Sequence, residues 1–161
     1  MQSEKTKTTG GELERQRAIC RNLRKKLDER PHNRLALVDT YGCQQNEAAS
    51  ERIRGWLAEM GFGFTEDEFS ADVIVINTCA VREHAEQRAL GNIGALSHAK
   101  KAKPGQTIAV CGCMAQKEGV AEKIKNSYPI VDLVFGTHEL WRFPELLDKA
   151  IFGGKRVFET A

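Results

Sequence analysis

The sequence predicts an α/β fold built on a doubly wound, mainly parallel sheet. Short apolar, β-branched runs alternate along the chain with longer stretches in which apolar residues recur at helical spacing. Strands that alternate with helices form parallel sheets with right-handed crossovers. The predicted architecture is therefore Rossmann- or flavodoxin-like, with four to five strands, helices on both faces and a helix before the first strand.

The first residues do not belong to this alternation. Residues 1–11 are polar and end in glycines, which is typical of a disordered arm. Residues 12–33 are predicted to form an N-terminal helix with one apolar face, because hydrophobic residues recur at helical spacing. The members of that face are Leu13, Cys20, Leu23 and Leu27. The face is expected to pack against the domain that follows.

Residues 34–152 contain the predicted domain. Four strands are expected over residues 35–38, 73–76, 108–110 and 131–135, and residues 62–64 can add a short fifth. The first crossover helix is expected to begin near Asn46, a good N-cap residue, and to end at Gly61. A later helix is expected over residues 115–126, and Pro144 begins a last one. Residues 153–161 are read as an exit strand or the start of a linker.

Composition limits the class of protein. A chain of 161 residues makes one ordinary domain, and its net charge of +2 does not argue for a nucleic-acid partner on its own. No apolar run is long enough to span a bilayer, and the N-terminus lacks the apolar core of a secretory signal. We therefore expect no membrane association and a cytoplasmic location. The five cysteines are then expected to be free, catalytic or metal-binding.

Three of the cysteines follow three of the predicted strands. Cys43, Cys79 and Cys113 are separated by 36 and 34 residues, about one strand–helix–strand unit each. All strands of a parallel sheet end at the same edge, so these three thiols are expected to converge there. Helices that begin after the cysteines would favour thiolates. Cys20 lies on a helical apolar face and Cys111 inside a strand, so both are expected to be packed in the core.

Three convergent thiols can serve different chemistries. Thiolates hold iron–sulfur clusters, and with three of them one iron of a 4Fe-4S cluster keeps an open coordination site. A zinc site with an exchangeable position is an alternative, with His84 or His138 as a further ligand, as is a thiol redox module. The remaining alternative is that the cysteines only pack in strand–helix turns.

Six polar residues lie close in sequence to these cysteines. They can hydrogen bond to a cluster or contact a substrate, but they can equally cap helices and satisfy loops. These residues are Thr40, Gln44, Asn46, Asn77, Arg82 and Gln116.

Several motifs resemble one known family. They are TYGCQQN (40–46), SERI (50–53), ADVIVINTCAVRE (71–83), CGCMAQ (111–116) and VDLVFGT (131–137). Together they resemble the N-terminal domain of the radical S-adenosylmethionine methylthiotransferases. The resemblance is closest to the branch that adds a methylthio group to C2 of N6-isopentenyladenosine next to the anticodon of tRNA.

This resemblance carries specific implications. It implies that Cys43, Cys79 and Cys113 ligate an auxiliary 4Fe-4S cluster with an open iron. It also implies a second 4Fe-4S cluster, bound by a CxxxCxxC motif in a following domain that uses S-adenosylmethionine. The chain has no CxxxCxxC, so it is expected to be an N-terminal fragment that is inactive alone. The implied partners are the tRNA anticodon stem-loop, the downstream radical and RNA-binding domains, and a sulfur donor.

Overall fold

A computed structural model describes residues 10–29, 34–41, 44–78 and 83–160. Its centre is one six-stranded sheet in the order β2-β1-β3-β4-β5-β6, in which every neighbouring pair is parallel. The strands are β1 Leu35–Thr40, β2 Gly63–Phe64, β3 Val73–Thr78, β4 Thr107–Gly112, β5 Leu133–Phe135 and β6 Val157–Glu159. The predicted doubly wound parallel fold is confirmed, and the sheet has one strand more than the expected four to five.

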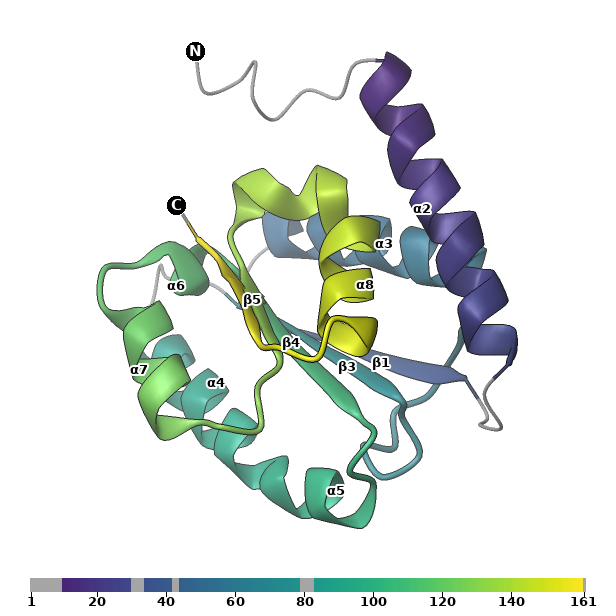
Figure 1. Ribbon diagram of the computed structural model, residues 1–161. Helices are drawn as coiled ribbons and strands as arrows, with labels where there is room; N and C mark the ends of the chain where they lie inside the picture. Colours follow the sequence, from purple (N-terminus) through teal and green to yellow (C-terminus); the bar gives the residue numbers. More distant parts are fainter. Residues whose placement is uncertain (1–9, 30–33, 42–43, 79–82, 161) are drawn as a thin grey trace.

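Helices cover both faces of this sheet (Figure 1). They are α2 Gly10–Asp28, α3 Gln44–Glu59, α4 Glu83–Ala95, α5 Ser97–Ala102, α6 Cys113–Gln116, α7 Val120–Ser127, the 3-10 helix η1 Thr137–Arg142 and α8 Phe143–Phe152. Buried residues of α2, α3 and α8 form one core cluster with the sheet, and those of α4, α6 and α7 form the other. Among the helices of the described residues, none combines the length and apolar character needed to cross a membrane.

The central strands are buried on both faces. Every residue of β3 and β4 is buried, as expected for apolar runs in the middle of a parallel sheet. Side chains alternate between the two cores, with Val73 and Val75 in the first and Ile74 and Ile76 in the second. Cys111 belongs to the first core, opposite Val110 in the second, so its predicted packing role is confirmed.

Helix α2 packs on α3 and α8 through one face. Cys20, Leu23 and Leu27 are buried there as predicted, whereas Leu13 is only half-buried. The buried residue of the first turns is instead Gln16, whose Nε2 donates to Glu145 Oε1 at 3.2 Å. The backbone N–H of Glu145 donates back to Gln16 Oε1 at 3.3 Å. This reciprocal pair lets a polar residue occupy the buried face.

The predicted segment boundaries differ from the structure at several places. Helix α2 begins at Gly10, inside the stretch expected to be an arm, and residues 1–9 and 30–33 lie outside the described residues. The expectation that Asn46 caps α3 is wrong, because the helix already begins at Gln44 and Gln is a good helix former. The continuous helix expected over 115–126 is also wrong. Gly119, with φ of 82°, separates α6 from α7.

The segment 153–161 contributes strand β6, which is parallel to β5 at the edge of the sheet. Arg156 connects this strand to the end of α7 and to the segment between α7 and β5 through hydrogen bonds. Its guanidinium donates to the carbonyl oxygens of Val131 at 2.8 Å, Lys125 at 2.9 Å and Tyr128 at 3.0 Å. Three carbonyls near the end of α7 thus find their donors in one side chain, which holds β6 against the sheet.

Candidate functional site

The candidate site lies at the carboxyl edge of β1, β3 and β4. These strands are neighbours, and their last residues are in register: Thr40 opposite Asn77, and Thr78 opposite Gly112. Cys79 is the residue after Thr78 in the chain, and Cys113 is the residue after Gly112. The thiol of Cys113 is free and its residue is exposed. Cys43 and Cys79 lie outside the described residues.

Gly112 shapes the turn that places Cys113. Its φ of 100° and ψ of −172° are angles that L side chains rarely adopt. A Cβ atom at this position would lie 2.2 Å from the Thr78 carbonyl oxygen and 2.8 Å from Asn77 Oδ1. Glycine is therefore required both by conformation and by the close approach of β3.

A buried polar network lies under the edge. Asn77 Nδ2 donates to Ser50 Oγ at 2.9 Å, and Ser50 Oγ lies 2.6 Å from Thr40 Oγ1. Because Ser50 accepts from Asn77 and is fully buried, its own proton is best satisfied by donation to Thr40. The proton of the half-buried Thr40 hydroxyl can then point out of the network toward the edge. The network ties α3 to the ends of β1 and β3.

Ser50 was not among the residues selected from the sequence. Its position within SERI, three residues before the core residue Ile53, places it on the inner side of α3. A serine on the apolar face of a helix is a signal that could have identified it, because buried hydroxyls need partners.

Thr78 and Cys111 connect the ends of β3 and β4, beside the polar network. Thr78 Oγ1 donates to the Cys111 carbonyl oxygen at 2.6 Å, and the Cys111 thiol faces Asn77 Oδ1 at 3.9 Å. Burial raises the pKa of the Cys111 thiol far above its ordinary value. The pKa of Cys20 is raised to about 11, first by burial and then by the charge of Glu59. Both thiols are core groups that stay protonated.

Gln116 packs across the edge toward β5. Its Oε1 accepts a hydrogen bond from Thr137 Oγ1 at 2.8 Å. Gly136 makes room for it, because a Cβ atom there would lie 2.6 Å from the Gln116 Cγ. The helix that starts at Cys113 is only four residues long, so the helix-dipole support expected for this thiolate is small.

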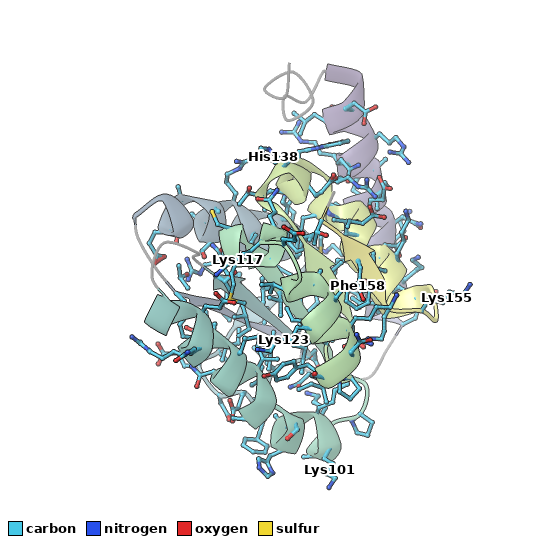
Figure 2. All side chains as sticks on the ribbon, turned by 90° about the vertical axis from the view of Figure 1, so that its left-hand side faces the viewer. Lys101, Lys117, Lys123, His138, Lys155 and Phe158 are labelled. Atoms are coloured by element: carbon cyan, nitrogen blue, oxygen red, sulfur yellow. The ribbon has the colours of Figure 1, made fainter. Side chains whose placement is uncertain are left out.

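The other residues selected from the sequence are only partly described. Gln44 and Asn46 lie in the first turn of α3, but their side chains and all of Arg82 are outside the described part of the structure, as is the His84 side chain. His138 is exposed in η1, above Lys117 in the view of Figure 2. Within the described residues, no group of three His, Cys, Asp or Glu could hold a metal ion. Cys43 and Cys79 are not among those residues.

Comparison with known sequences agrees with this geometry. Residues 35–136, from the start of β1 to the end of β5, match the model of the Uncharacterized protein family UPF0004. The chain belongs to this family. The UPF0004 match contains Cys43, Cys79 and Cys113 and the Thr40–Ser50–Asn77 network. Helices α2 and α8, all of η1 and strand β6 lie outside it.

Relatives of this UPF0004 chain carry a common name, tRNA-2-methylthio-N(6)-dimethylallyladenosine synthase. The protein of that name from Natranaerobius thermophilus is 52% identical over 122 residues, covering 76% of this chain and 27% of the relative. Those from Halalkalibacterium halodurans and Clostridium tetani are 50% and 49% identical, covering 77% and 76% of this chain. The chain spans only 23% and 27% of those two proteins.

Proposed function

We propose that this chain is the N-terminal part of a tRNA methylthiotransferase that modifies C2 of N6-isopentenyladenosine next to the anticodon. We further propose that this part holds an auxiliary 4Fe-4S cluster through Cys43, Cys79 and Cys113. The observation that carries the proposal is the exposed thiol of Cys113 directly after the paired ends of β3 and β4. The names of the relatives support the substrate class.

The donor set fits such a cluster. Iron–sulfur clusters are held by thiolates, and the edge offers an exposed thiol at residue 113 while Cys20 and Cys111 are withdrawn into the core. Cys79 follows Thr78, the partner of Gly112, and Cys43 follows Thr40 by three residues. When bound, a cluster with three protein thiolates supplies one iron that can carry sulfur for transfer.

The residues of this chain have their own tasks in the proposal. Gly112 fixes the turn that exposes Cys113, and the Thr78 hydroxyl holds β4 at that point. The Asn77–Ser50–Thr40 network orients the Thr40 hydroxyl as a hydrogen-bond donor at the edge. Donors near cluster sulfurs tune the redox potential, and Thr40 would have this role.

The rest of the reaction belongs to the remainder of the protein in this proposal. S-adenosylmethionine, a second 4Fe-4S cluster, the radical domain and an RNA-binding domain would lie in segments that the relatives have beyond the matched quarter. The tRNA anticodon stem-loop and a sulfur donor would be the partners. This chain alone would not catalyse the reaction, and the cytoplasm would keep its thiols reduced.

Anaerobic reconstitution with iron and sulfide tests the cluster. We expect about four iron and four sulfide per chain and a broad thiolate-to-iron absorption. We expect most of the iron to be lost in each of the variants Cys43→Ala, Cys79→Ala and Cys113→Ala. Cys111→Ala is the matched control, because Cys111 lies two residues from Cys113, and it is expected to retain the iron. Full iron content in all three edge variants would contradict the proposal. Zinc without iron in anaerobically purified protein would favour the zinc or thiol redox alternative.

A further inference from the structure

An open pocket of about 310 Å³ lies between α2, α3 and η1. In Figure 1 η1 and α3 lie above the sheet, and α2 runs along the outside of the molecule. Trp56 of α3 and Trp141 of η1 line the pocket together with Leu13 of α2. Both tryptophans are only half-buried, so their rings contribute to an accessible wall. The pocket thus presents aromatic surface to the solvent.

The pocket is also lined by charged groups. Arg17 of α2 and Arg52 of α3 are exposed at its wall, and Glu59 is the acidic member. Arg17 makes a long contact of 3.9 Å with the exposed Glu14. Arginines therefore outnumber carboxylates around the two indoles.

The positive charge continues along α2. Arg21 and Arg24 follow Arg17 at helical spacing, and both are exposed. Both stand close enough to Cys20 for their charges to act on its thiol. Together, Arg17, Arg21, Arg24 and Arg52 make a basic ridge beside the aromatic pocket.

We propose that this pocket and ridge are a contact site for RNA. A nucleobase would stack on the indoles of Trp56 and Trp141, and the guanidinium groups of Arg17 and Arg52 would bind phosphates. Unstacked bases and phosphates are the groups that a combination of aromatic rings and arginines recognises. The inference rests on the proposed function for its choice of RNA as the substrate class, and it adds a location to it.

η1 connects the end of β5 to the pocket that Trp141 lines. η1 begins directly after Gly136, at the end of β5, where Thr137 donates to Gln116. Trp141 is four residues further along this 3-10 helix, which corresponds to about 8 Å at roughly 2 Å per residue. That is little more than two base steps of about 3.4 Å. In the proposal, one stem-loop contacts both the edge and the pocket.

Only part of the site lies within the residues that match the family. Leu13, Arg17 and Trp141 lie outside the matched residues 35–136, whereas Arg52 and Trp56 lie within them. Helix α2 and the end of η1 complete a surface that α3 alone cannot form.

Tryptophan fluorescence reports on this site directly, because Trp56 and Trp141 are the two tryptophans of the chain. The probe is a synthetic RNA stem-loop with an unpaired seven-nucleotide loop (roughly the size of an anticodon loop) titrated into the chain at low salt. We expect the tryptophan fluorescence to be quenched until the site is saturated. The logarithm of the association constant should fall linearly with the logarithm of the salt concentration, with a slope set by the number of phosphates contacted. Trp141→Phe is expected to reduce the quenched signal while the chain stays folded.

Substitutions that remove arginine charges test whether the basic ridge contributes to RNA binding. Arg17→Gln and Arg52→Gln are each expected to weaken binding about five- to tenfold and to reduce the salt slope by about one. Lys101→Gln is the matched control, because Lys101 is an exposed cation of α5 at the opposite end of the view in Figure 2 from His138 of η1. Unchanged affinity in the Arg17→Gln, Arg52→Gln double variant, or an absence of quenching, would overturn the inference.

The two proposals fail in different ways. A chain that takes up iron and sulfide through its edge cysteines but shows no quenching by the stem-loop would sink only the pocket. A chain that binds the stem-loop but never holds a cluster would leave the pocket in place and sink the proposed cluster. Both measurements use the same purified chain.

Discussion

Gly112 lies so close to Thr78 that a Cβ atom on the glycine would be 2.2 Å from the Thr78 carbonyl oxygen. The two residues are opposite each other at the ends of β4 and β3, and the Thr78 hydroxyl also donates to the carbonyl of Cys111. The last step of β4 is thereby fixed against β3. Cys113, the exposed thiol of the candidate site, leaves the sheet from this contact.

Gly112→Ala is expected to destabilise the chain by at least about 2 kcal/mol, because the new methyl group meets backbone atoms and the positive φ becomes strained. Urea unfolding measures the change. Gly91→Ala is the control: this glycine is exposed in α4 and nothing lies within 4 Å of a Cβ there. It is expected to stabilise the chain by up to about 1 kcal/mol through helix propensity. Equal effects of the two substitutions would contradict the proposed contact.

The sheet could be predicted from sequence because β3 and β4 are continuous apolar runs, and such runs carry their own signal. The edge position of Cys113 followed from topology alone, since parallel strands end together. The split between α6 and α7 could not be predicted, because it depends on the φ of 82° at Gly119. Glycine is compatible with either a helix or a break, so the residue type alone does not distinguish them.

The polar network was the part of the site that sequence indicated least. Thr40 and Asn77 were selected for their closeness to cysteines, and nothing in their spacing connects them. Ser50 of α3 connects them, because its hydroxyl contacts both side chains. A three-body hydrogen-bond network depends on the distance between a helix and two strands, and no local pattern encodes that distance.

Ser50→Ala is expected to cost about 1–3 kcal/mol, because it removes both the hydrogen bond from Asn77 Nδ2 and the contact with Thr40 Oγ1 at a buried position. Urea unfolding gives the value. Ser127→Ala at the exposed end of α7 is the matched control and should change stability by less than about 0.5 kcal/mol. Thr40→Val is expected to be partly non-additive with Ser50→Ala, since both remove the same contact. Full additivity would argue that the network is not formed.

The cysteines are expected to differ sharply in reactivity toward a maleimide. Cys113 is exposed and should react faster than Cys20 and Cys111, which are each only 2% exposed. At pH 8 a pKa of about 11 leaves about one Cys20 in a thousand as the reactive thiolate. Mass spectrometry of peptides after timed labelling measures each site, and labelling in urea should equalise the rates. Rapid labelling of Cys20 in the native chain would contradict its core position.

The dependence of stability on pH below neutrality should reflect the contact between α2 and α8. Burial alone would raise the pKa of Glu145, but the Gln16 hydrogen bond, the charge of Arg142 and the interactions with Lys149 outweigh it and lower the pKa. A carboxylate whose pKa is lowered in the folded state stabilises the chain at pH values above the ordinary pKa of 4.5. That contribution is expected to disappear as the pH falls below 4.5 and through the folded-state pKa.

Glu145→Gln removes this titration while keeping the side chain's shape. We expect it to lose about 1 kcal/mol at pH 7, where the charged hydrogen bond from Gln16 and the ion pairs are present, and less at pH 3. Urea unfolding at both pH values measures the difference between variant and parent. Glu118→Gln, at an exposed position before α7, is the matched control and should run parallel to the parent at both pH values. A constant difference for Glu145→Gln from pH 7 to pH 3 would show that its carboxylate does not stabilise the helix pair, and α2 would then be held by its apolar face alone.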